Sequence, residues 1–467
     1  MEKNGEIIPR LISPGRQHNN MKQIIEALTP MNRCLMGEGY DSALEFLKHL
    51  LKFDVIEIPS GTKLETWTVP EEWRVRDAYI TYKGKEILSY HDNPMCLMVG
   101  SMPFSGKVDL EELKNHLYIS DDMPDSTPYE YTLYEKKWGF SLPKNVALKE
   151  KGGLWSKLAK ACEECADWGD QKIKIKVQGQ KDKRNYIDAL PKGEYEVHID
   201  TDFVPGKMKL AVHTIPGESD REILLFAHLD HPFQANDNLS GVACLVDLAT
   251  RLKAKHTVKI IICPETIGSI AYSLTQDISK VDFVLSVDIC GNNNTLLIQK
   301  SFDNFSRLNR VAHCAMQIIG KSYRKGAFRN TIGSDEYPFN DPTINIPGLL
   351  LTRWPYKEYH TDEDTADKIN YEMIKETQEV IEKIIEIYEK DYIPVRKFKA
   401  PLMRGRYDLH SPNKQMNLNF DYLIFSVDGK KSLAELCADF EVNFDFLYER
   451  FERLEKDGFI GRVPNLS

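Results

Sequence analysis

The sequence predicts an α/β protein with a mixed central sheet flanked by helices, an inserted, mainly β module and a C-terminal winged helix. Between residues 191 and 395, short apolar runs alternate with amphipathic stretches, as they do in βαβ units. Residues 64–148 are instead rich in Thr, Tyr, Trp and Val with turn breaks, which indicates short antiparallel strands. Residues 396–467 begin as a linker and continue with strand, helix, turn and helix patterns.

Length, charge and cysteine usage limit the classes of protein to consider. A chain of 467 residues exceeds one ordinary core, so two or three domains are expected. Its net charge of −9 argues against a nucleic-acid-binding surface, and no apolar run reaches the length of a membrane span. The polar start MEKNGEIIPRLISPGRQHNN lacks the apolar core of a secretory signal, and the nine scattered cysteines fit a reducing compartment. We therefore expect a cytoplasmic protein that binds neither nucleic acid nor membrane.

The segment 1–63 is predicted to open the main domain, before the inserted module at 64–148. Apolar residues recur at helical spacing from Met21 to Leu51, which predicts two helices, and Phe53–Pro59 has the pattern of a strand. Inside the module we expect a further strand at Met95–Met102, a short helix at Leu110–Leu117 and a Tyr-rich loop at Pro124–Trp138. Its core candidates are Trp67, Trp73 and Trp138.

Residues 149–190 form a variable, charged connector in this division. Its basic stretch KIKIKVQGQKDKRN is interpreted as a solvated surface strand rather than an anion site. Cys162 and Cys165 form a lone Cys-x-x-C without a second pair at zinc-ribbon spacing, so two helical cysteines are the preferred interpretation.

The main part of the predicted domain, 191–395, alternates strands with helices. The expected strands are YEVHIDTDF, MKLAVHTIP, Glu222–Ala227, Val258–Cys263, Phe283–Ile289 and Gly348–Thr352, and the expected helices are Val242–Leu252, Gly268–Leu274, Phe305–Ile319 and Ile369–Tyr392. This alternation favours a sheet with parallel strands and helices on its faces.

The last predicted domain, 396–467, is interpreted as a strand at LIFSVDG, a helix at SLAELCADF and a second helix at NFDFLYERFERLEKDGFIG. Such an order is typical of a winged helix. The second helix carries Asp445, Glu449, Glu452, Glu455 and Asp457, which would repel a phosphate backbone. We therefore interpret the domain as an interaction or dimerisation module, and association with further copies of the chain is left open.

The stretch from Arg221 to Leu252 carries the first candidate functional residues. His228, Asp230 and His231 crowd the carboxyl end of its predicted strand, and Asp237 follows in a short loop before a helix. Open α/β sheets place their sites at such strand ends, and imidazole and carboxylate groups are good zinc ligands. The alternative is a polar turn beside a partly buried histidine.

Three later stretches add ligand-type side chains at or near further strand ends. Glu265 lies in CPETIGS, Asp288 in SVDICG and His360 in PYKEYHTDED. Each has an ordinary explanation by itself, as a helix-capping Glu, a strand-end Asp or a loop His. Four strand ends that each deliver a His or carboxylate are better explained by a shared metal site.

The order HLD, DN-x-SG, a Glu-containing turn, VD and YHT-x-x-D resembles the co-catalytic zinc aminopeptidases, with their phosphorylase/hydrolase-like fold. The whole chain is more closely similar to the bacterial aminopeptidase-like family, which has an inserted β domain and a C-terminal winged helix. The stretches IPSGTKLETWTVPEEWRVRDAYI, KKWGFSLP, ANDNLSG, PETIGSIAY and GSDE carry that similarity. It covers nearly everything from about residue 20 onward, apart from the Lys149–Asn185 stretch.

The resemblance implies metal ligands. His228, Asp237 and Asp288 would bind one zinc ion, and Asp237 would bridge to a second ion that His360 also binds. Asp230 would hydrogen-bond His228 and fix its tautomer and orientation.

The resemblance also implies a reaction. Glu265 matches the general base, which would take a proton from metal-bound water before the water attacks a peptide carbonyl.

The sequence departs from the aminopeptidase pattern at Thr266, where a second Glu would bind the second metal. The site of the second metal ion then keeps only Asp237 and His360 of the aminopeptidase pattern. Glu336, in GSDEYPF, stands where many relatives carry a His and would complete the shell or contact the substrate amine, and His231 is a spare ligand. One zinc ion, or a second one bound weakly, is therefore left open.

Two residues before or beside His360 are candidates for substrate binding. Arg353 and Tyr359 would bind a substrate carboxylate, although Arg353 could instead pair with a structural acid. Glu336 or Asp335 would anchor the free amine of the substrate.

The sequence thus predicts a zinc-dependent aminopeptidase-like hydrolase acting on a peptide or an aminoacyl small molecule. Two alternatives stay open: a metal-binding scaffold with reduced catalysis, and an amide hydrolase of surface polysaccharide biosynthesis, which the family resemblance suggests.

Overall fold

The centre of the structure is an eight-stranded mixed sheet with strand order β1-β10-β12-β11-β13-β16-β14-β15. The computed structural model describes residues 20–144, 190–407 and 414–463. In sheet order the strands are β1 (Asp54–Pro59), β10 (Lys207–Ile215), β12 (Thr257–Cys263), β11 (Glu222–His228), β13 (Val281–Asp288), β16 (Gly348–Thr352), β14 (Leu297–Gln299) and β15 (Arg324–Gly326).

The four middle strands β12, β11, β13 and β16 are mutually parallel, so their carboxyl ends meet at one edge of the sheet. His228 lies opposite Cys263, and Asp288 lies opposite Thr352. Because β10 runs antiparallel to β12, this edge is the one at which β10 begins. The predicted mixed sheet is confirmed, and so is the alignment of the strand ends.

Helices cover both faces of the sheet, which explains the nearly continuous apolar runs of its strands. Alternate residues of β11 point to opposite faces: Ile223 and Leu225 belong to one core, Leu224 and Phe226 to the other. The first core contains α2 (Asn20–Leu28), α3 (Glu38–Leu50), α7 (Gly241–Ala249), α9 (Arg307–Ile319) and α10 (Tyr371–Lys390). The second contains α8 (Ile267–Thr275). The helices predicted for these regions, including the two between Met21 and Leu51, are confirmed.

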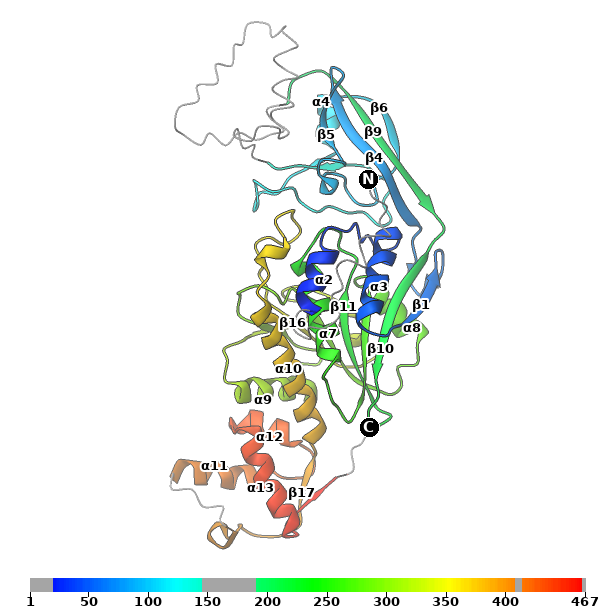
Figure 1. Cartoon of the computed structure of the whole chain (residues 1–467). Helices are drawn as coiled ribbons and strands as arrows, with labels where there is room; N and C mark the ends of the chain where they lie inside the picture. Colours follow the sequence, from blue (N-terminus) through cyan, green and yellow to red (C-terminus); the bar gives the residue numbers. More distant parts are fainter. Residues whose placement is uncertain (1–19, 145–189, 408–413, 464–467) are drawn as a thin grey trace, which may run out of the picture.

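A second sheet of four strands, β5-β4-β9-β6, stands at one end of the molecule, at the top of Figure 1. Its strands are β4 (Glu72–Tyr82), β5 (Lys85–Ser89), β6 (Phe104–Asp109) and β9 (Glu194–Val204), with α4 (Leu110–Lys114) following β6. Three strands come from the predicted module at 64–148, and β9 comes from beyond the predicted boundary at 190. The five-part division of the chain stays a prediction.

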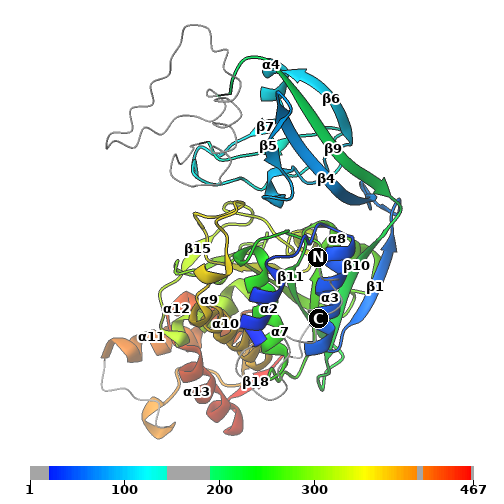
Figure 2. The same ribbon diagram turned by 45° about the horizontal axis from the view of Figure 1, so that its top comes forward.

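Two long strand pairs join the two sheets. β1 pairs with β10 in the main sheet, and β4 pairs with β9 in the second sheet. Between them, the Ser60 amide donates to the Gly206 carbonyl at 3.0 Å and the Gly206 amide donates to Ser60 Oγ at 2.9 Å. The pairing therefore continues across the bend, as the ribbon at the right of Figures 1 and 2 shows.

The core of the second sheet contains two of the three tryptophans proposed for it. Trp138 is buried and stacks on His116 at a centroid distance of 3.6 Å, and Trp73 packs at the edge of the same core. Trp67 instead packs against the core of the main sheet. The strand predicted at Met95–Met102 is wrong: Pro94–Cys96 forms a short 3₁₀ turn, and Leu97 and Val99 make only isolated bridges.

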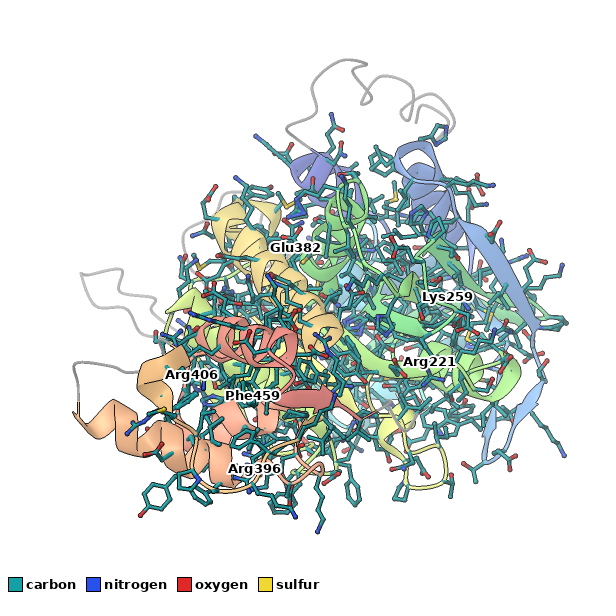
Figure 3. All side chains as sticks on the ribbon, turned by 90° about the horizontal axis from the view of Figure 1, so that it is seen from below. Arg221, Lys259, Glu382, Arg396, Arg406 and Phe459 are labelled. Atoms are coloured by element: carbon teal, nitrogen blue, oxygen red, sulfur yellow. The ribbon has the colours of Figure 1, made fainter. Side chains whose placement is uncertain are left out.

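The C-terminal segment forms three helices and a two-stranded sheet below the main sheet (Figures 1 and 3). They are β17 (Pro394–Arg396), α11 (Lys414–Phe425), α12 (Leu433–Phe440), α13 (Phe444–Lys456) and β18 (Ile460–Arg462). β17 pairs with β18, close to Arg396 and Phe459, which Figure 3 labels. The strand predicted at LIFSVDG is wrong, because α11 extends to Phe425 and only Asp428 makes a β-bridge. The winged helix stays a prediction.

Most of the charged connector predicted at 149–190 lies outside the described residues, as do Cys162 and Cys165. Among the described helices, none is long and apolar enough to cross a membrane.

Candidate metal centre

The carboxyl ends of the parallel strands bring the predicted ligands together. His228 is the last residue of β11 and Asp288 the last of β13. Glu265 follows the end of β12, and His360 lies in the loop after β16. Asp237 lies in a short turn, η3 (Asn236–Ser240), between β11 and α7.

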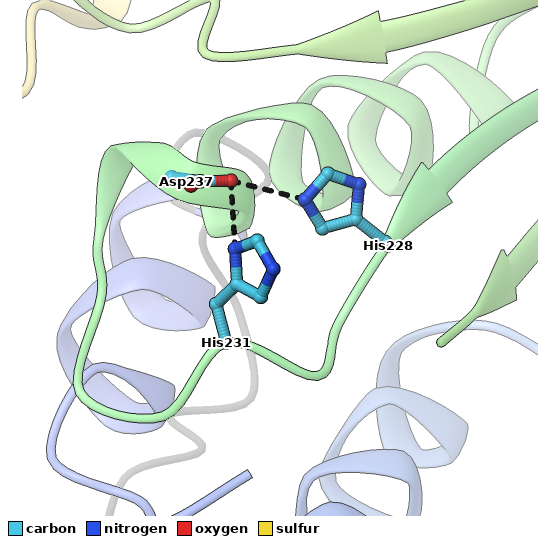
Figure 4. A group of neighbouring side chains, drawn as sticks. All are labelled: His228, His231 and Asp237. Carbon is cyan, nitrogen blue, oxygen red and sulfur yellow. Dashed lines mark hydrogen bonds and ion pairs between the residues drawn. The ribbon is translucent and has the colours of Figure 1, made fainter. Parts of the chain in front are cut away.

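Asp237 is the centre of the cluster. Its Oδ1 lies 3.0 Å from His228 Nε2 and 2.9 Å from His231 Nδ1, as Figure 4 shows. Its Oδ2 lies 3.2 Å from Nε2 of His360, so three imidazoles surround one carboxylate. The Asp237 backbone is held by Asp364, whose Oδ2 accepts a hydrogen bond from the Asp237 amide at 3.0 Å.

Two further carboxylates extend the cluster. Asp288 Oδ1 lies 3.9 Å from His228 Nε2, and Glu265 Oε2 lies 3.2 Å from His231 Nε2. Ligand atoms of His228, Glu265 and Asp288 fall within 4.8 Å of one another, and the same holds for His228, His231 and Asp237.

The donor set fits a divalent metal ion. Asp237 and Asp288 are each 1% exposed and His228 is fully buried. Asp237 Oδ2, Asp288 Oδ1, His231 Nδ1 and His360 Nε2 are buried and make no hydrogen bond of good geometry, although the two imidazole nitrogens lie within 3.2 Å of Asp237 oxygens. Buried polar atoms normally have partners, and imidazole nitrogens with carboxylate oxygens are the ligands that zinc prefers. The polar atoms that converge here therefore form a donor set that a divalent cation would bind.

The pKa values of Asp237 and Asp288 depend on burial and on the charges of the neighbouring side chains. Burial alone would raise the pKa of Asp237, but the neighbouring histidines hold that pKa well below its ordinary value. Burial raises the pKa of Asp288 well above its ordinary value, against the attraction of His228. A bound cation would stabilise both carboxylates in their charged form.

Asp230 differs from its prediction. Its Oδ1 accepts a hydrogen bond from the Glu265 amide at 2.8 Å, so it positions the loop of Glu265. Asp335 takes the predicted place beside His228: its Oδ2 lies 3.5 Å from His228 Nδ1, and its Oδ1 accepts from the Thr266 amide at 3.0 Å. The carboxylate that lies beside His228 Nδ1 thus comes from the GSDE stretch.

Glu336 does not belong to either group of converging ligand atoms, and Thr266 offers a hydroxyl in place of a carboxylate. Thr266 begins the turn into α8 with a positive φ of 61°. Glu336 is buried against Gln299, whose Nε2 donates to Glu336 Oε1 at 3.3 Å, and burial raises the pKa of Glu336 to about 7. The carboxylate that the sequence lacks at Thr266 is thus not replaced by Glu336, whereas His231 lies directly beside Asp237.

Arg353 and Tyr359 have different positions. Arg353 is 1% exposed, and its Nη2 donates to Glu376 Oε1 at 3.0 Å. It therefore pairs with a structural acid, which was the alternative to binding a substrate carboxylate. Tyr359 stacks on the His360 ring with centroids 3.8 Å apart and an interplanar angle of 15°. It supports His360 from one side.

Sequence reasoning missed Asp364 and Tyr129, which shape the site, and gave Asp335 a different role. Asp364 ends the quoted YHT-x-x-D pattern, and a role for it could have been proposed from that pattern. The position of Asp335 beside His228 depends on a long loop. Tyr129 was interpreted only as part of a loop, although its ring lies 5.0 Å from that of His360.

Comparisons with known proteins identify the sequence family of the chain and proteins that it resembles. The sequence model of a family described as "Domain of unknown function (DUF4910)" matches residues 22–391. A Clostridium acetobutylicum protein named "Putative polysaccharide biosynthesis protein with aminopeptidase-like domain" is 27% identical over 430 residues, which cover 89% of each chain.

Solved structures share the fold. A crystal structure described as a "putative peptidase" from Clostridium acetobutylicum covers 98% of both chains, with a TM-score of 0.73 and 24% identity. BSAP, a zinc aminopeptidase from Bacillus subtilis, has a TM-score of 0.53 at 14% identity, over 79% of this chain and 93% of its own. A Peptidase M28 precursor from Shewanella amazonensis has a TM-score of 0.52 at 15% identity, over 82% and 96%. The predicted aminopeptidase-like fold is confirmed.

Proposed function

Since the chain belongs to the family described as a domain of unknown function (DUF4910), a description that names no activity, we propose its function from the site itself. The protein is a metal-dependent hydrolase that cleaves an amide bond beside a free amino group, on a peptide or an aminoacyl small molecule.

One observation carries the proposal: a buried carboxylate, Asp237, is surrounded by His228, His231 and His360, with Asp288 and Glu265 beside them. Several of their polar atoms are buried without a hydrogen bond of good geometry, and a bound cation would satisfy them. The aminopeptidase-like fold supports zinc as that cation.

The ligands divide into two sets around Asp237. His228, Asp237 and Asp288 would hold the first zinc ion. His360 and Asp237 Oδ2 would hold a second ion, whereas His231 lies at the same Asp237 oxygen as His228 and is a spare ligand of the first set. Zinc at this position supplies a Lewis acid that polarises the carbonyl and lowers the pKa of water.

Glu265 acts as the general base. Its side chain is one quarter exposed, so it reaches the space in front of the cluster. Burial would raise its pKa, but His228 and His231 lower it below the ordinary value, so the carboxylate is charged at neutral pH. It takes a proton from the attacking water and passes it to the leaving amine. The hydrogen bond from its amide to Asp230 fixes its loop.

A specific observation favours a second candidate function. The clostridial relative that covers 89% of this chain is named as a polysaccharide biosynthesis protein. The same site would then hydrolyse an amide on a sugar-linked intermediate. For the location we keep the cytoplasm as a proposal, because the cysteines in the described part of the chain are free.

The test compares the wild type, Glu265→Gln and the control Glu218→Gln, which changes an exposed loop carboxylate before β11. Atomic emission measures bound metal, and a panel of aminoacyl-nitroanilides measures turnover. We expect zinc in all three proteins and turnover that Glu265→Gln lowers at least a thousandfold.

Each other result has a clear meaning. Absence of bound metal in the wild type would refute the metal centre, and full turnover in Glu265→Gln would refute the role of Glu265. Bound zinc without turnover on any amide would favour a metal-binding scaffold over the hydrolase.

A further inference from the structure

A segment of the part built on the second sheet docks against the loop that carries His360. We call residues 127–132, between β7 (Leu117–Tyr118) and β8 (Phe140–Ser141), the Tyr129 segment. The Thr127 amide donates to Asp362 Oδ1 at 2.9 Å, and the Asp362 amide donates to the Thr127 carbonyl at 3.0 Å. The Tyr129 amide donates to the His360 carbonyl at 2.8 Å. These bonds form a short antiparallel bridge between Pro128 and Thr361.

The other edge of the Tyr129 segment is also paired. The Val99 amide donates to the Glu130 carbonyl at 2.9 Å, and the Thr132 amide donates to the Val99 carbonyl at 2.8 Å. The segment is thus held by backbone hydrogen bonds on both sides. The backbone from which its side chains project is therefore fixed relative to His360.

Alternate residues of an extended segment point to the same side, so Tyr129 and Tyr131 share one face. Their rings lie 5.6 Å apart with an interplanar angle of 27°. The Tyr129 ring lies 5.6 Å from that of His231, and the Tyr131 ring lies 6.2 Å from that of His360. Both tyrosines therefore face the candidate metal centre.

The two rings differ in exposure. Tyr129 is 8% exposed and fills the space between the histidines, whereas Tyr131 is 48% exposed. Tyr131 thus offers a fixed, half-exposed aromatic surface beside the atoms proposed to react.

We propose that Tyr131 forms one wall of the substrate pocket and selects substrates whose amine-bearing residue has a large apolar or aromatic side chain. This inference rests on the proposed function, because it places the substrate's amide at the metal centre. An aromatic ring held in place gains contact with an apolar side chain without a new cost in side-chain entropy. The part of the chain that contains the second sheet thereby determines the substrate specificity of the metal centre, whose ligands lie at the strand ends of the main sheet.

The test uses amino acid hydroxamates, which bind zinc through the hydroxamate and leave the side chain to probe the pocket. Calorimetry measures the dissociation constants of glycine, leucine and phenylalanine hydroxamate for the zinc-loaded full chain. We expect the wild type to bind the phenylalanine compound about tenfold more tightly than the glycine compound. Tyr131→Ala should abolish this preference with unchanged metal content, and Tyr131→Phe should retain it.

Tyr422→Ala is the matched control, because Tyr422 is 68% exposed on α11, in the C-terminal segment. It should leave the preference unchanged. Should Tyr131→Ala lose its metal, Tyr131→Trp replaces it: the larger ring narrows the pocket and should weaken phenylalanine hydroxamate more than glycine hydroxamate.

A preference that survives in Tyr131→Ala, or a wild type that binds all three compounds equally, would overturn the pocket wall while the metal centre stands. A wild type that binds no metal would overturn the proposed function and this inference together, so the two failures are distinguishable by metal content.

Discussion

His256 should make the stability of the protein depend on pH between about 6.5 and 9. It directly precedes β12, on the edge of the sheet opposite the metal centre. Its Nε2 lies 2.9 Å from Asp282 Oδ2 on β13, and its Nδ1 lies 3.1 Å from Glu389 Oε1 on α10. Arg221, labelled in Figure 3, pairs with Asp282 from the other side. The imidazole therefore links the sheet to the long helix that covers it.

The magnitude follows from the pKa. Burial alone would lower the pKa of His256, but Asp282 and Glu389 raise it to about 9, above the ordinary value of about 6.5. A raised pKa in the folded state stabilises the protein fully below pH 6.5, and this contribution is lost as the pH rises through 9. The difference between the two pKa values corresponds to about 3 kcal/mol.

The assay measures the free energy of unfolding by urea at pH 6, 7.5 and 9.5 for the wild type, His256→Gln and His49→Gln. His49 is an exposed histidine on α3 and serves as control. The advantage of the wild type over His256→Gln should shrink by about 3 kcal/mol from pH 6 to pH 9.5. Taking this difference cancels titration of the metal centre. A pH-independent difference between these two proteins would refute the linkage.

Two further predictions concern the metal. Asp335→Asn should weaken zinc affinity about tenfold to a hundredfold in chelator competition, because Asp335 lies beside His228 and would orient it. Asp230→Asn should instead keep that affinity and lower turnover, because Asp230 holds the loop of Glu265. Equal zinc affinities in the two variants would contradict this assignment. Removal of the metal by a chelator should lower the melting temperature, and added zinc should restore it. A ligand present at a hundred times its dissociation constant stabilises the fold by about 2.7 kcal/mol. A melting temperature that does not respond to the chelator would speak against a bound ion.

The sequence predicted the main sheet and the meeting of its strand ends because both follow from local patterns. Buried parallel strands are continuously apolar, and a ligand at the end of each strand marks their common edge. The orientation of His228 by Asp335 could not be predicted in this way. Asp335 lies in the connection between β15 and β16, and no local period encodes the path of such a loop.

The wrong strand at LIFSVDG has a related cause. A short apolar run such as Leu423 to Phe425 fits a strand or a helix equally well. The structure assigns it to the end of α11, where Leu423 and Ile424 are buried and Phe425 is 58% exposed. Likewise, Tyr129 carries no sequence signal of its own. Its place at the site follows from backbone pairing with a loop that is distant in the chain.

The continuous ribbon between the two sheets makes the second sheet an elaboration of a hairpin. The chain leaves the main sheet at Pro59 and returns at Lys207, and these two residues are register partners. A tight turn could therefore join β1 to β10 without altering any other strand of the main sheet. The residues beyond that turn could be exchanged in evolution as a cassette only if two sets of contacts were replaced: those of Trp67 with the main core and those of the Tyr129 segment with the His360 loop. An exchange of the cassette would therefore alter the surroundings of His360 as well as the second sheet.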